Sequence, residues 1–422
     1  MELLVLLASF ILFLVLGASV ASAMIVSAVL SLMVNGLPMT IMAERVLSGI
    51  NSYTLLAVPF FIFAAVIINR AGLTDRLLEV ARCFVGHFRG GTAQVDVLAS
   101  IFFAGMSGSA TADAASQGRI LIPHMKKEGY DAGFAAGVNS ASATIGAIIP
   151  PSITMVIYGS VTNISVGALF LAGIIPGLLV GLALMAMGTV LSARRGYPRQ
   201  PYMPWKDRWQ PIFTAFPALL APVIILGGIF TGATTPTEAG GGAGVLGMFL
   251  GFFVFCELQV EDIMPLFAET VEATAVPVYI IGAGSVFGFA LTMSGFGFMV
   301  QDMMAGLVQG PTAFLLVVIA IFMLVGLFVE GTAAMLIFVP VFMPMVQQFG
   351  IDQLQFAIIV IITLLIGTIT PPVGLQLFIA ADIAKLSVFK VDIWPFVAIM
   401  LVVVLAIVFA PGLVTWLPGL IL

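Results

Sequence analysis

The chain has 422 residues, of which 61% are hydrophobic and only 8% are charged, and its mean hydropathy is +1.21. Because a soluble chain carries about a quarter charged residues, this composition excludes a cytosolic enzyme, a nucleic-acid-binding protein and a disordered protein. Apolar stretches of about 20 residues recur along the chain, which indicates a polytopic membrane protein. The charges are uneven, since residues 1–208 carry 13 Lys and Arg against 9 Asp and Glu, whereas residues 209–422 carry 2 against 11.

The hydropathy pattern predicts a series of apolar helical segments. The first run is too long for one upright span at about 1.5 Å per residue, so we expect a tilted helix or a helix pair there. The predicted segments, in chain order, are 3–34, 54–69, 92–122, 132–161, 165–192, 211–230, 237–256, 273–297, 311–345, 354–383 and 393–420.

Three segments between these runs are polar or amphipathic. Residues 73–88 place Leu77, Ala81 and Phe84 on one helical face and cations largely on the other, which predicts a helix along the cytoplasmic interface. Residues 194–208 form a polar connector. Residues 257–272 carry five acids and no cation, so they are expected on the outer face.

A repeat of 221 residues relates the two halves of the chain. The segment Ile145–Ser152 (IGAIIPPS) recurs as Ile366–Val373 (IGTITPPV), and PHMKKEGYD from Pro123 recurs as PMVQQFGID from Pro344. Apolar composition alone does not explain matched Pro, Gly and acidic residues at one shift. We therefore predict two structural repeats, residues 1–208 and residues 209–422.

The charges predict that the two repeats are inverted in the membrane. The first repeat has Arg89, Arg119, Lys126 and Lys127 around this unit, whereas residues 310–348 contain no Lys or Arg. Because cations accumulate in cytoplasmic loops, the second copy is expected to face outward. Inverted repeats of this kind occur in many secondary transporters.

Each repeat contains a segment that is too short to cross the membrane twice. Arg89 and Arg119 lie 30 residues apart, and small residues interrupt the segment between them at Gly105–Thr111. Arms of about 13 residues reach roughly 20 Å, less than a hydrocarbon core of about 30 Å. We predict a re-entrant hairpin at about 89–119, with its tip near mid-membrane, and a second at about 311–344, with its tip at Glu330–Ala333.

Two proline pairs predict broken helices. Pro150-Pro151 and Pro371-Pro372 each remove two backbone donors within a long apolar segment, so the helix must break at 146–152 and at 367–374. Broken backbone at membrane depth persists only against protein or a water-filled cavity, where it can bind ions or anionic groups. Either pair alone is compatible with a packing kink, but two breaks opposite two hairpin tips favour one central site.

Charged residues inside apolar segments are candidate functional residues. A carboxylate at Glu330 costs several kcal/mol unless it is paired or hydrated; a structural carboxyl at a helix end is the alternative. Asp113 is a weaker candidate, and Glu238 fits a first-turn acid. The GxSG pattern at Gly105–Gly108 matches rhomboid proteases, but neither histidine lies in an apolar segment, so Ser107 lacks a general base.

Four motifs together resemble one transporter family. They are FFAGMSGSATADAASQG (Phe102–Gly118), GAIIPPS (Gly146–Ser152), TGATTPTEA (Thr231–Ala239) and GTITPPVG (Gly367–Gly374). Over essentially its whole length, the chain resembles the large membrane subunit of TRAP transporters, often called DctM.

The resemblance implies an all-α, elevator-type secondary transporter of the bacterial inner membrane. Such a transporter is driven by a Na⁺ gradient and imports an organic acid such as a C4-dicarboxylate or sialic acid. The resemblance also implies two partners, a periplasmic substrate-binding protein and a small four-helix membrane subunit. Since the chain starts directly at the large subunit, that small subunit is expected to be a separate chain.

The same resemblance implies roles for individual residues. The first tip and first break are similar to one Na⁺ site and to the substrate-facing surface, and the second tip and second break are similar to another Na⁺ site. The residues similar to Na⁺ ligands are Ser107, Gly108, Ser109, Thr111, Gly146, Pro150, Gly331, Thr332, Gly367, Thr368, Thr370 and Val373. Those expected to contact the substrate are Ser107, Ser109, Ser152 and Glu330.

These residue types fit Na⁺, because hydroxyl and carbonyl oxygens are hard ligands. No Lys or Arg lies near either tip, so a substrate carboxylate would meet Na⁺, hydroxyl groups and helix N-termini.

Other functions stay open at this point. A stand-alone ion-coupled carboxylate symporter would share the hairpins but need no partner subunit. A membrane scaffold without transport activity has no need for polar tips at mid-membrane. Coupling to protons through Glu330 is an alternative to coupling to Na⁺, and the sequence leaves the substrate itself open.

Overall fold

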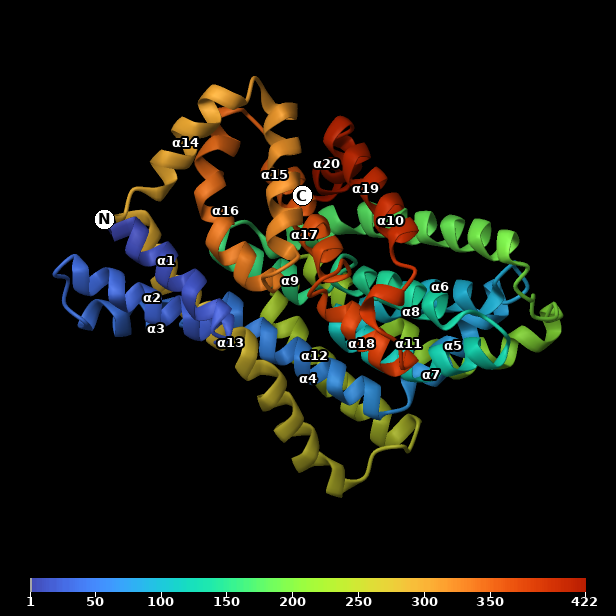
Figure 1. Cartoon of the computed structure of the whole chain (residues 1–422). Coiled ribbons are helices and arrows are strands. Elements are labelled where there is room, and N and C mark those ends of the chain that lie inside the picture. Colours follow the sequence, from blue (N-terminus) through green and yellow to red (C-terminus); the bar gives the residue numbers. More distant parts are fainter. Residues whose placement is uncertain (1) are drawn as a thin grey trace.

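The computed structural model describes residues 2–422 and is helical throughout, with no β-strand in that range (Figure 1). Five helices are long and apolar enough to cross a bilayer, or seven when two pairs bent by 62° and 61° count as one span each. This arrangement confirms the predicted all-α polytopic class.

The first apolar run is a helix pair. Gly17, at a φ of +86°, turns the chain between the two helices, a conformation that glycine adopts without steric cost. Residues 40–50 form a further helix outside the predicted segments, since Glu44 and Arg45 interrupt its apolar residues. The elements of the first half are α1 (Glu2–Val15), α2 (Val20–Val34), α3 (Thr40–Ile50), η1 (Thr54–Leu56), α4 (Ala57–Arg70), α5 (Leu73–Val85), α6 (Gly91–Ser107), α7 (Ala110–Lys127), α8 (Ala132–Ala143), η2 (Thr144–Ala147), α9 (Ile153–Thr162) and α10 (Val166–Arg195).

The second half begins within the predicted polar connector, because its first helix already starts at Trp205. A short helix at 296–307 also lies outside the predicted segments. The elements of the second half are α11 (Trp205–Phe230), α12 (Pro236–Phe249), the π turn η3 (Leu250–Val254), η4 (Val260–Asp262), α13 (Ile263–Met293), α14 (Phe296–Leu307), α15 (Pro311–Gly326), α16 (Gly331–Gln348), α17 (Gln353–Thr368), α18 (Leu375–Ala384), η5 (Val388–Lys390), α19 (Trp394–Phe409) and α20 (Gly412–Ile421).

Equivalent elements of the two halves follow the 221-residue shift. After this shift, helices α5 to α9 start within two residues of α14 to α18, respectively. The amphipathic helix α5 thus has a counterpart in α14. The opposite orientation of the two copies in the membrane stays a prediction.

Both hairpins are longer than predicted. Helices α6 and α7 have 17 and 18 residues, and the exposed Arg119 lies within α7, which continues to Lys127. The second hairpin, α15 and α16, likewise continues past Pro344 to Gln348. Arms of this size reach roughly 24–27 Å, still less than a hydrocarbon core of about 30 Å.

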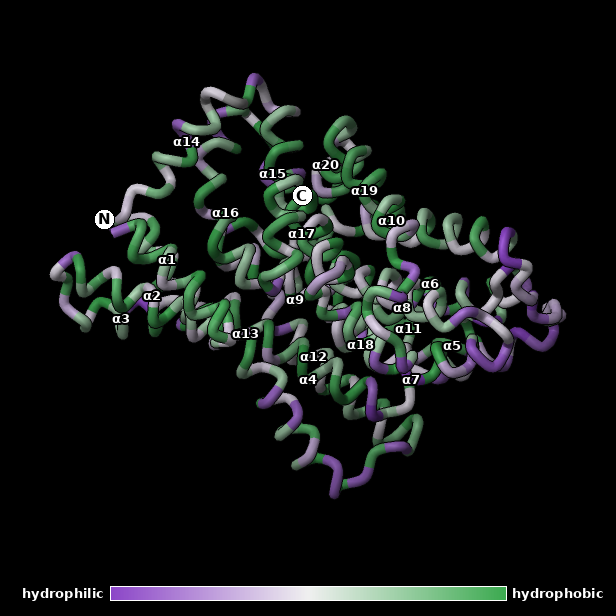
Figure 2. Tube along the Cα trace, viewed as in Figure 1, coloured by the Kyte–Doolittle hydropathy of each residue, from purple (hydrophilic) through white to green (hydrophobic). Residues whose placement is uncertain are grey.

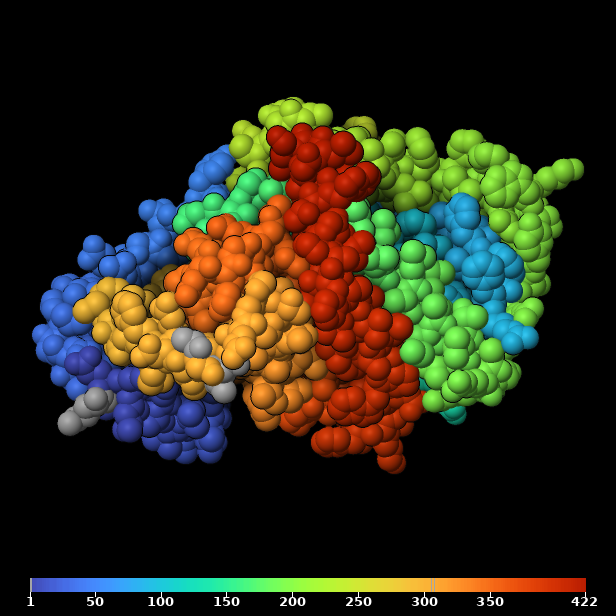
Figure 3. Space-filling view, turned by 90° about the horizontal axis from the view of Figure 1, so that it is seen from above, coloured from blue at the N-terminus to red at the C-terminus, as the bar shows by residue number. Residues whose placement is uncertain are grey.

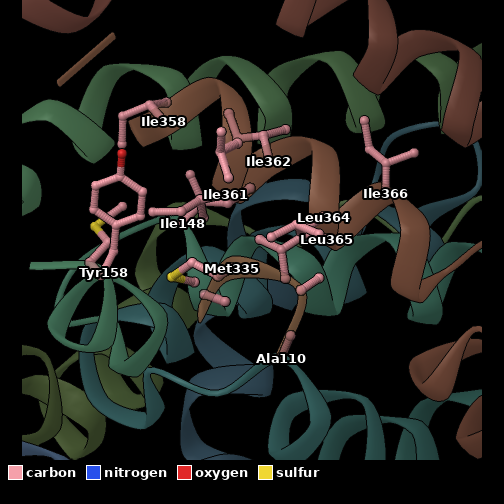
Figure 4. Packing of buried hydrophobic residues seen from close by; sticks show 14 of the residues in the cluster. Ala110, Ile148, Tyr158, Met335, Ile358, Ile361, Ile362, Leu364, Leu365 and Ile366 are labelled. Carbon is pink, nitrogen blue, oxygen red and sulfur yellow. The ribbon is translucent and has the colours of Figure 1, made fainter. Parts of the chain in front are cut away.

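The two halves interlock at the breaks. Helix α18, which follows the second break, packs on α7 and α8, and helix α9, which follows the first break, packs on α16. Each half-helix therefore packs on the hairpin of the other repeat. Figure 4 shows the resulting core, in which Tyr158 of α9 points towards Ile358 of α17 and Ala110 of α7 lies near Leu364 and Leu365.

The C-terminal helices close one face of this core. Helices α19 and α20 pack on α10 and α17 and form a continuous band between the second hairpin and α10 in the space-filling view (Figure 3). Hydrophilic segments gather at the ends of the helices, including the start of α13 (Figure 2).

The acid-rich segment lies beside α5, on the face that the sequence assigned to the cytoplasm. Arg70 Nη2 is 3.1 Å from Asp262 Oδ1, and Arg76 Nη2 is 3.2 Å from Glu257 Oε1. The prediction that residues 257–272 face outward while α5 faces the cytoplasm is therefore wrong. These acidic residues form ion pairs with cations from another part of the chain, and a count of charges along the sequence does not reveal this pairing.

Candidate functional site

Both hairpin tips and both helix breaks border one cavity of about 720 Å³. Residues of helices α4 and α13 also line this cavity. The polar lining residues are Asn69, Ser107, Ser109, Thr111, Thr154, Glu269, Glu330, Thr332, Thr368 and Gln376.

The first tip is fixed by hydrogen bonds and by a tight turn. Ser107 ends α6, and its Oγ donates to Asp113 Oδ1 at 2.5 Å. Gly108 follows with a φ of +61°, and a Cβ there would lie 2.7 Å from the Pro151 carbonyl oxygen. Ser109 Oγ then caps α7 by accepting from the Ala112 N–H. The tip therefore meets the first break through backbone contact that only glycine permits.

The Ser152 hydroxyl group of the first break is bonded to the backbone and does not line the cavity. The Pro150-Pro151 peptide bond is cis, and Ser152 caps α9. Ser152 Oγ donates to the Ala147 carbonyl at 2.6 Å and is fully buried. A Cβ on Gly146 would lie 2.0 Å from Asp113 Oδ2, an oxygen that is buried and forms no hydrogen bond within residues 2–422.

The second tip is held mainly by its own helix end. Glu330 is the N-cap of α16 and accepts from the Thr332 N–H at 2.9 Å, the Ala333 N–H at 3.2 Å and the Thr332 hydroxyl at 3.0 Å. This is the helix-end position that the sequence left open as the alternative for Glu330. Its side chain is exposed and also borders the cavity, where the positive end of the α16 dipole stabilises its charge.

The second break resembles the first, but different side chains bond to its backbone. Its Pro371-Pro372 peptide bond is also cis. Thr368 Oγ1 donates to the Leu365 carbonyl at 2.6 Å and contacts Gln376 Oε1 at hydrogen-bonding distance. Thr370 Oγ1 donates to the Ile366 carbonyl at 2.7 Å. Gly367 packs directly on Gly326, so the break and the second hairpin approach each other backbone to backbone.

The structure brings most of the sequence-predicted site residues to one place. Nine of them border the cavity: Ser107, Gly108, Ser109, Thr111, Glu330, Gly331, Thr332, Thr368 and Val373. Five others lie in the two breaks without lining it: Gly146, Pro150, Ser152, Gly367 and Thr370. Their individual roles stay predictions.

Four polar residues of the cavity are absent from the predicted site residues, namely Asn69, Thr154, Glu269 and Gln376. Asn69 lies on α4, Glu269 on α13, and Gln376 in the first turn of α18. Asn69 and Gln376 carry a recognisable signal, because each is an isolated amide beside apolar residues. Glu269 was assigned to the outer acidic segment and thereby left out.

The donor set is compatible with Na⁺ as a transported ion. It contains hydroxyl oxygens at the first tip and the buried, unpaired Asp113 Oδ2 close to the backbone of Gly146. Oxygen-only ligands of this kind suit hard cations.

Comparison with known proteins identifies the family. Residues 7–413 match the family model described as "Tripartite ATP-independent periplasmic transporter, DctM component". The chain is 39% identical to the sialic acid TRAP transporter large permease protein SiaM of Vibrio cholerae, over 82% of this chain and 81% of that protein. It is 36% identical to the C4-dicarboxylate TRAP transporter large permease protein DctM of the same species, over 88% of this chain and 86% of that protein. Two further relatives are longer, and the chain spans 62% and 65% of their length.

A solved structure shares the fold. The YdaH transporter of Alcanivorax borkumensis superimposes with a TM-score of 0.60 over 90% of this chain and 88% of that chain, at 16% identity. The curated relatives are named as transporter permeases, which are not enzymes. Together with the apolar helices, they show a multi-pass protein of the inner membrane. The chain belongs to the DctM family, the large permease component of TRAP transporters.

Proposed function

We propose that the chain is the permease subunit of a Na⁺-coupled importer of an organic acid. It would receive its substrate from a periplasmic substrate-binding protein and work with a small membrane subunit. The observation that carries the proposal is the convergence of two hairpin tips and two helix breaks on one cavity. The names of the relatives, for sialic acid and C4-dicarboxylates, support an organic acid as substrate.

Two Na⁺ sites fit the two tip-and-break pairs. At the first pair, the Ser107, Ser109 and Thr111 hydroxyl groups and the Gly146 backbone would hold one ion beside the unpaired Asp113 oxygen. At the second pair, Gly331, Thr332, Gly367, Thr368, Thr370 and Val373 would hold the other. A bound cation would supply the positive charge that the cavity lacks for an anionic substrate.

An elevator movement fits the packing. The interlocked contacts of α18 on α7 and of α9 on α16 join both tips and both breaks into one packed unit. Helices α4 and α13 border the cavity from outside this unit. We expect the unit to move as a rigid body along α4 and α13, because the tips cannot separate without breaking the core between the repeats.

Uptake by the reconstituted complex tests the proposal. The permease, the small subunit and the binding protein are placed in proteoliposomes, and uptake of labelled sialic acid and succinate is followed with and without an inward Na⁺ gradient. Uptake is expected only with the gradient, and uptake unchanged without it would overturn Na⁺ coupling. Uptake driven by pH alone would instead assign coupling to protons, and uptake without the binding protein would indicate a stand-alone symporter.

A substitution at the second tip tests the second Na⁺ site. Thr332→Val removes one hydroxyl oxygen that borders the cavity, so the Na⁺ concentration for half-maximal uptake is expected to rise several-fold. Thr415→Val in α20 is the control, because its hydroxyl bonds only to the Pro411 carbonyl. An unchanged Na⁺ dependence in Thr332→Val would count against this site.

A further inference from the structure

The side chains that line the cavity carry negative rather than positive charge, which is unusual for a protein that transports an anion. Among the residues that the structure describes, the lining of the cavity contains two carboxylates, Glu269 and Glu330, but no Lys, Arg or His. Its only side-chain nitrogen atoms belong to Asn69 and Gln376. Any side-chain N–H group that meets the substrate must therefore come from these two amides.

Each amide oxygen lies against a threonine hydroxyl group. Asn69 Oδ1 accepts from the Thr74 hydroxyl at 3.1 Å, and Gln376 Oε1 is contacted by the Thr368 hydroxyl. Neither Nδ2 of Asn69 nor Nε2 of Gln376 forms a hydrogen bond within the described residues. Gln376 is only 3% exposed as a residue and lines the cavity. The two NH₂ groups remain available to a ligand.

The two carboxylates differ in how far their charge is compensated. Glu330 accepts two backbone N–H groups at the start of α16. Glu269 forms no ion pair or hydrogen bond to any part of the chain that the structure describes. The two Na⁺ ions proposed above would offset these two carboxylates, so a ligand with two negative charges would still enter a cavity with no cationic side chain to meet its second charge.

We propose that the Asn69 and Gln376 N–H groups bind the acid group of the substrate, and that the cavity selects substrates with one negative charge over dicarboxylates. This inference rests on the proposed transport function and specifies its substrate class. Neutral amide donors suit a single carboxylate or sulfonate, and the hydroxyl groups of the tips suit a polar, uncharged remainder. Gln376 is expected to contribute more than Asn69, since it lies within the packed unit that holds both tips.

Equilibrium binding to the purified permease and small subunit in nanodiscs, with Na⁺ present, tests the proposal. The probes are sialic acid and isethionate, which carry one charge, and succinate, which carries two. At least one singly charged probe is expected to bind at least tenfold more tightly than succinate. Equal or tighter binding of succinate, or binding of neither singly charged probe, would overturn the proposal.

Isosteric variants test the two amides directly. Gln376→Glu keeps the size of the side chain and an oxygen near Thr368 but replaces the NH₂ group with an anionic oxygen, so the dissociation constant is expected to rise at least tenfold. Asn69→Asp is expected to raise it less. Gln301→Glu in α14 and Asn163→Asp, at the exposed end of α9, add the same charge outside the cavity and are expected to leave binding unchanged.

Failure of this inference and failure of the proposed function give different results. If the wild-type complex shows no Na⁺-dependent uptake, the transport function itself fails. If it takes up substrate with Na⁺ and the Gln376→Glu complex binds and transports equally well, only the role of Gln376 is overturned. Should Gln376→Glu fold poorly, Gln376→Leu with a wild-type thermal unfolding midpoint provides the same comparison.

Discussion

The two hairpin tips occupy equivalent positions but are held in different ways. The first tip bonds within its own hairpin, where Ser107 Oγ donates to Asp113, and also to the first break, where the Gly108 carbonyl accepts from the Ile153 N–H at 3.2 Å. The second tip bonds mainly to itself, through the Glu330 cap, and leaves Phe328 63% exposed. Gly326, at the end of α15, packs directly on Gly367 of the second break.

This difference indicates that the two tips differ in how readily they change position. Moving the first tip away from the first break would break the hydrogen bond between Ile153 and the buried Gly108 carbonyl, which costs free energy. The second tip can change position while its cap stays intact, because Glu330, Thr332 and Ala333 move together. We therefore expect the second tip to rearrange more readily when substrate enters or leaves.

The largest expected effect comes from Gly367→Ala. The added Cβ would lie 2.7 Å from Gly326 Cα and 2.9 Å from its carbonyl oxygen, and backbone atoms cannot yield as a flexible side chain does. We expect a loss of about 3 kcal/mol in the free energy of unfolding and loss of uptake. Chemical unfolding of the purified chain measures the first quantity.

Gly331→Ala is the matched control in the same tip. Its Cβ would have Leu364 Cβ as its nearest neighbour, at 3.8 Å, which is ordinary van der Waals contact. Equal stability of the two variants would show that the glycine contact does not hold the second tip.

Ser107→Ala should produce a smaller loss at the first tip. It removes the only hydrogen bond that the structure gives to the Asp113 carboxyl group, whose other oxygen already lacks a partner. A buried group left without its partner costs about 1–3 kcal/mol, so we expect a loss of about 2 kcal/mol in the free energy of unfolding. Ser160→Ala removes a hydroxyl bonded only to the Ile157 carbonyl and serves as the control. A loss no larger than that of the control would contradict the view that this bond fixes the first tip.

The smallest effect is expected from Glu330→Ala. Loss of the N-cap costs about 1 kcal/mol, and its effect should stay within the first turn of α16. Hydrogen exchange is expected to accelerate at Thr332 and Ala333 but not in α7, and Glu330→Asp should restore protection because Asp is also a favourable cap. Faster exchange throughout both hairpins would show that the two tips are coupled rather than separately held.

The tips and breaks could be predicted because their chemistry is local. Glycine and proline change the backbone conformation at their own positions. Their matched spacing therefore located both hairpins and both breaks in the sequence. The ends of the hairpins could not be placed in the same way, since Arg119 and Pro344 both sit within helices. An arginine can lie on the exposed face of a helix, and a proline is tolerated when neighbouring groups satisfy the freed carbonyl.

The remaining errors concern contacts between distant parts of the chain. Asp262 and Glu257 lie beside Arg70 and Arg76 only because the fold brings α4, α5 and the start of α13 together. Gln376 became a candidate only when the structure placed it in the cavity. An isolated amide in an apolar segment has several possible partners, and the sequence does not specify which of them it meets.

The interlocking of the repeats has a consequence for biosynthesis. Lys126, at the end of the first hairpin, donates to the carbonyl of Ala384, which lies 258 residues further along the chain. A ribosome that adds about 5–20 residues per second needs roughly 13–50 s to reach that residue. During this interval, the first hairpin lacks α18, one of the helices that cover it, while its polar tip is already made. The insertion machinery must therefore keep the incompletely packed first hairpin away from lipid until translation is almost complete.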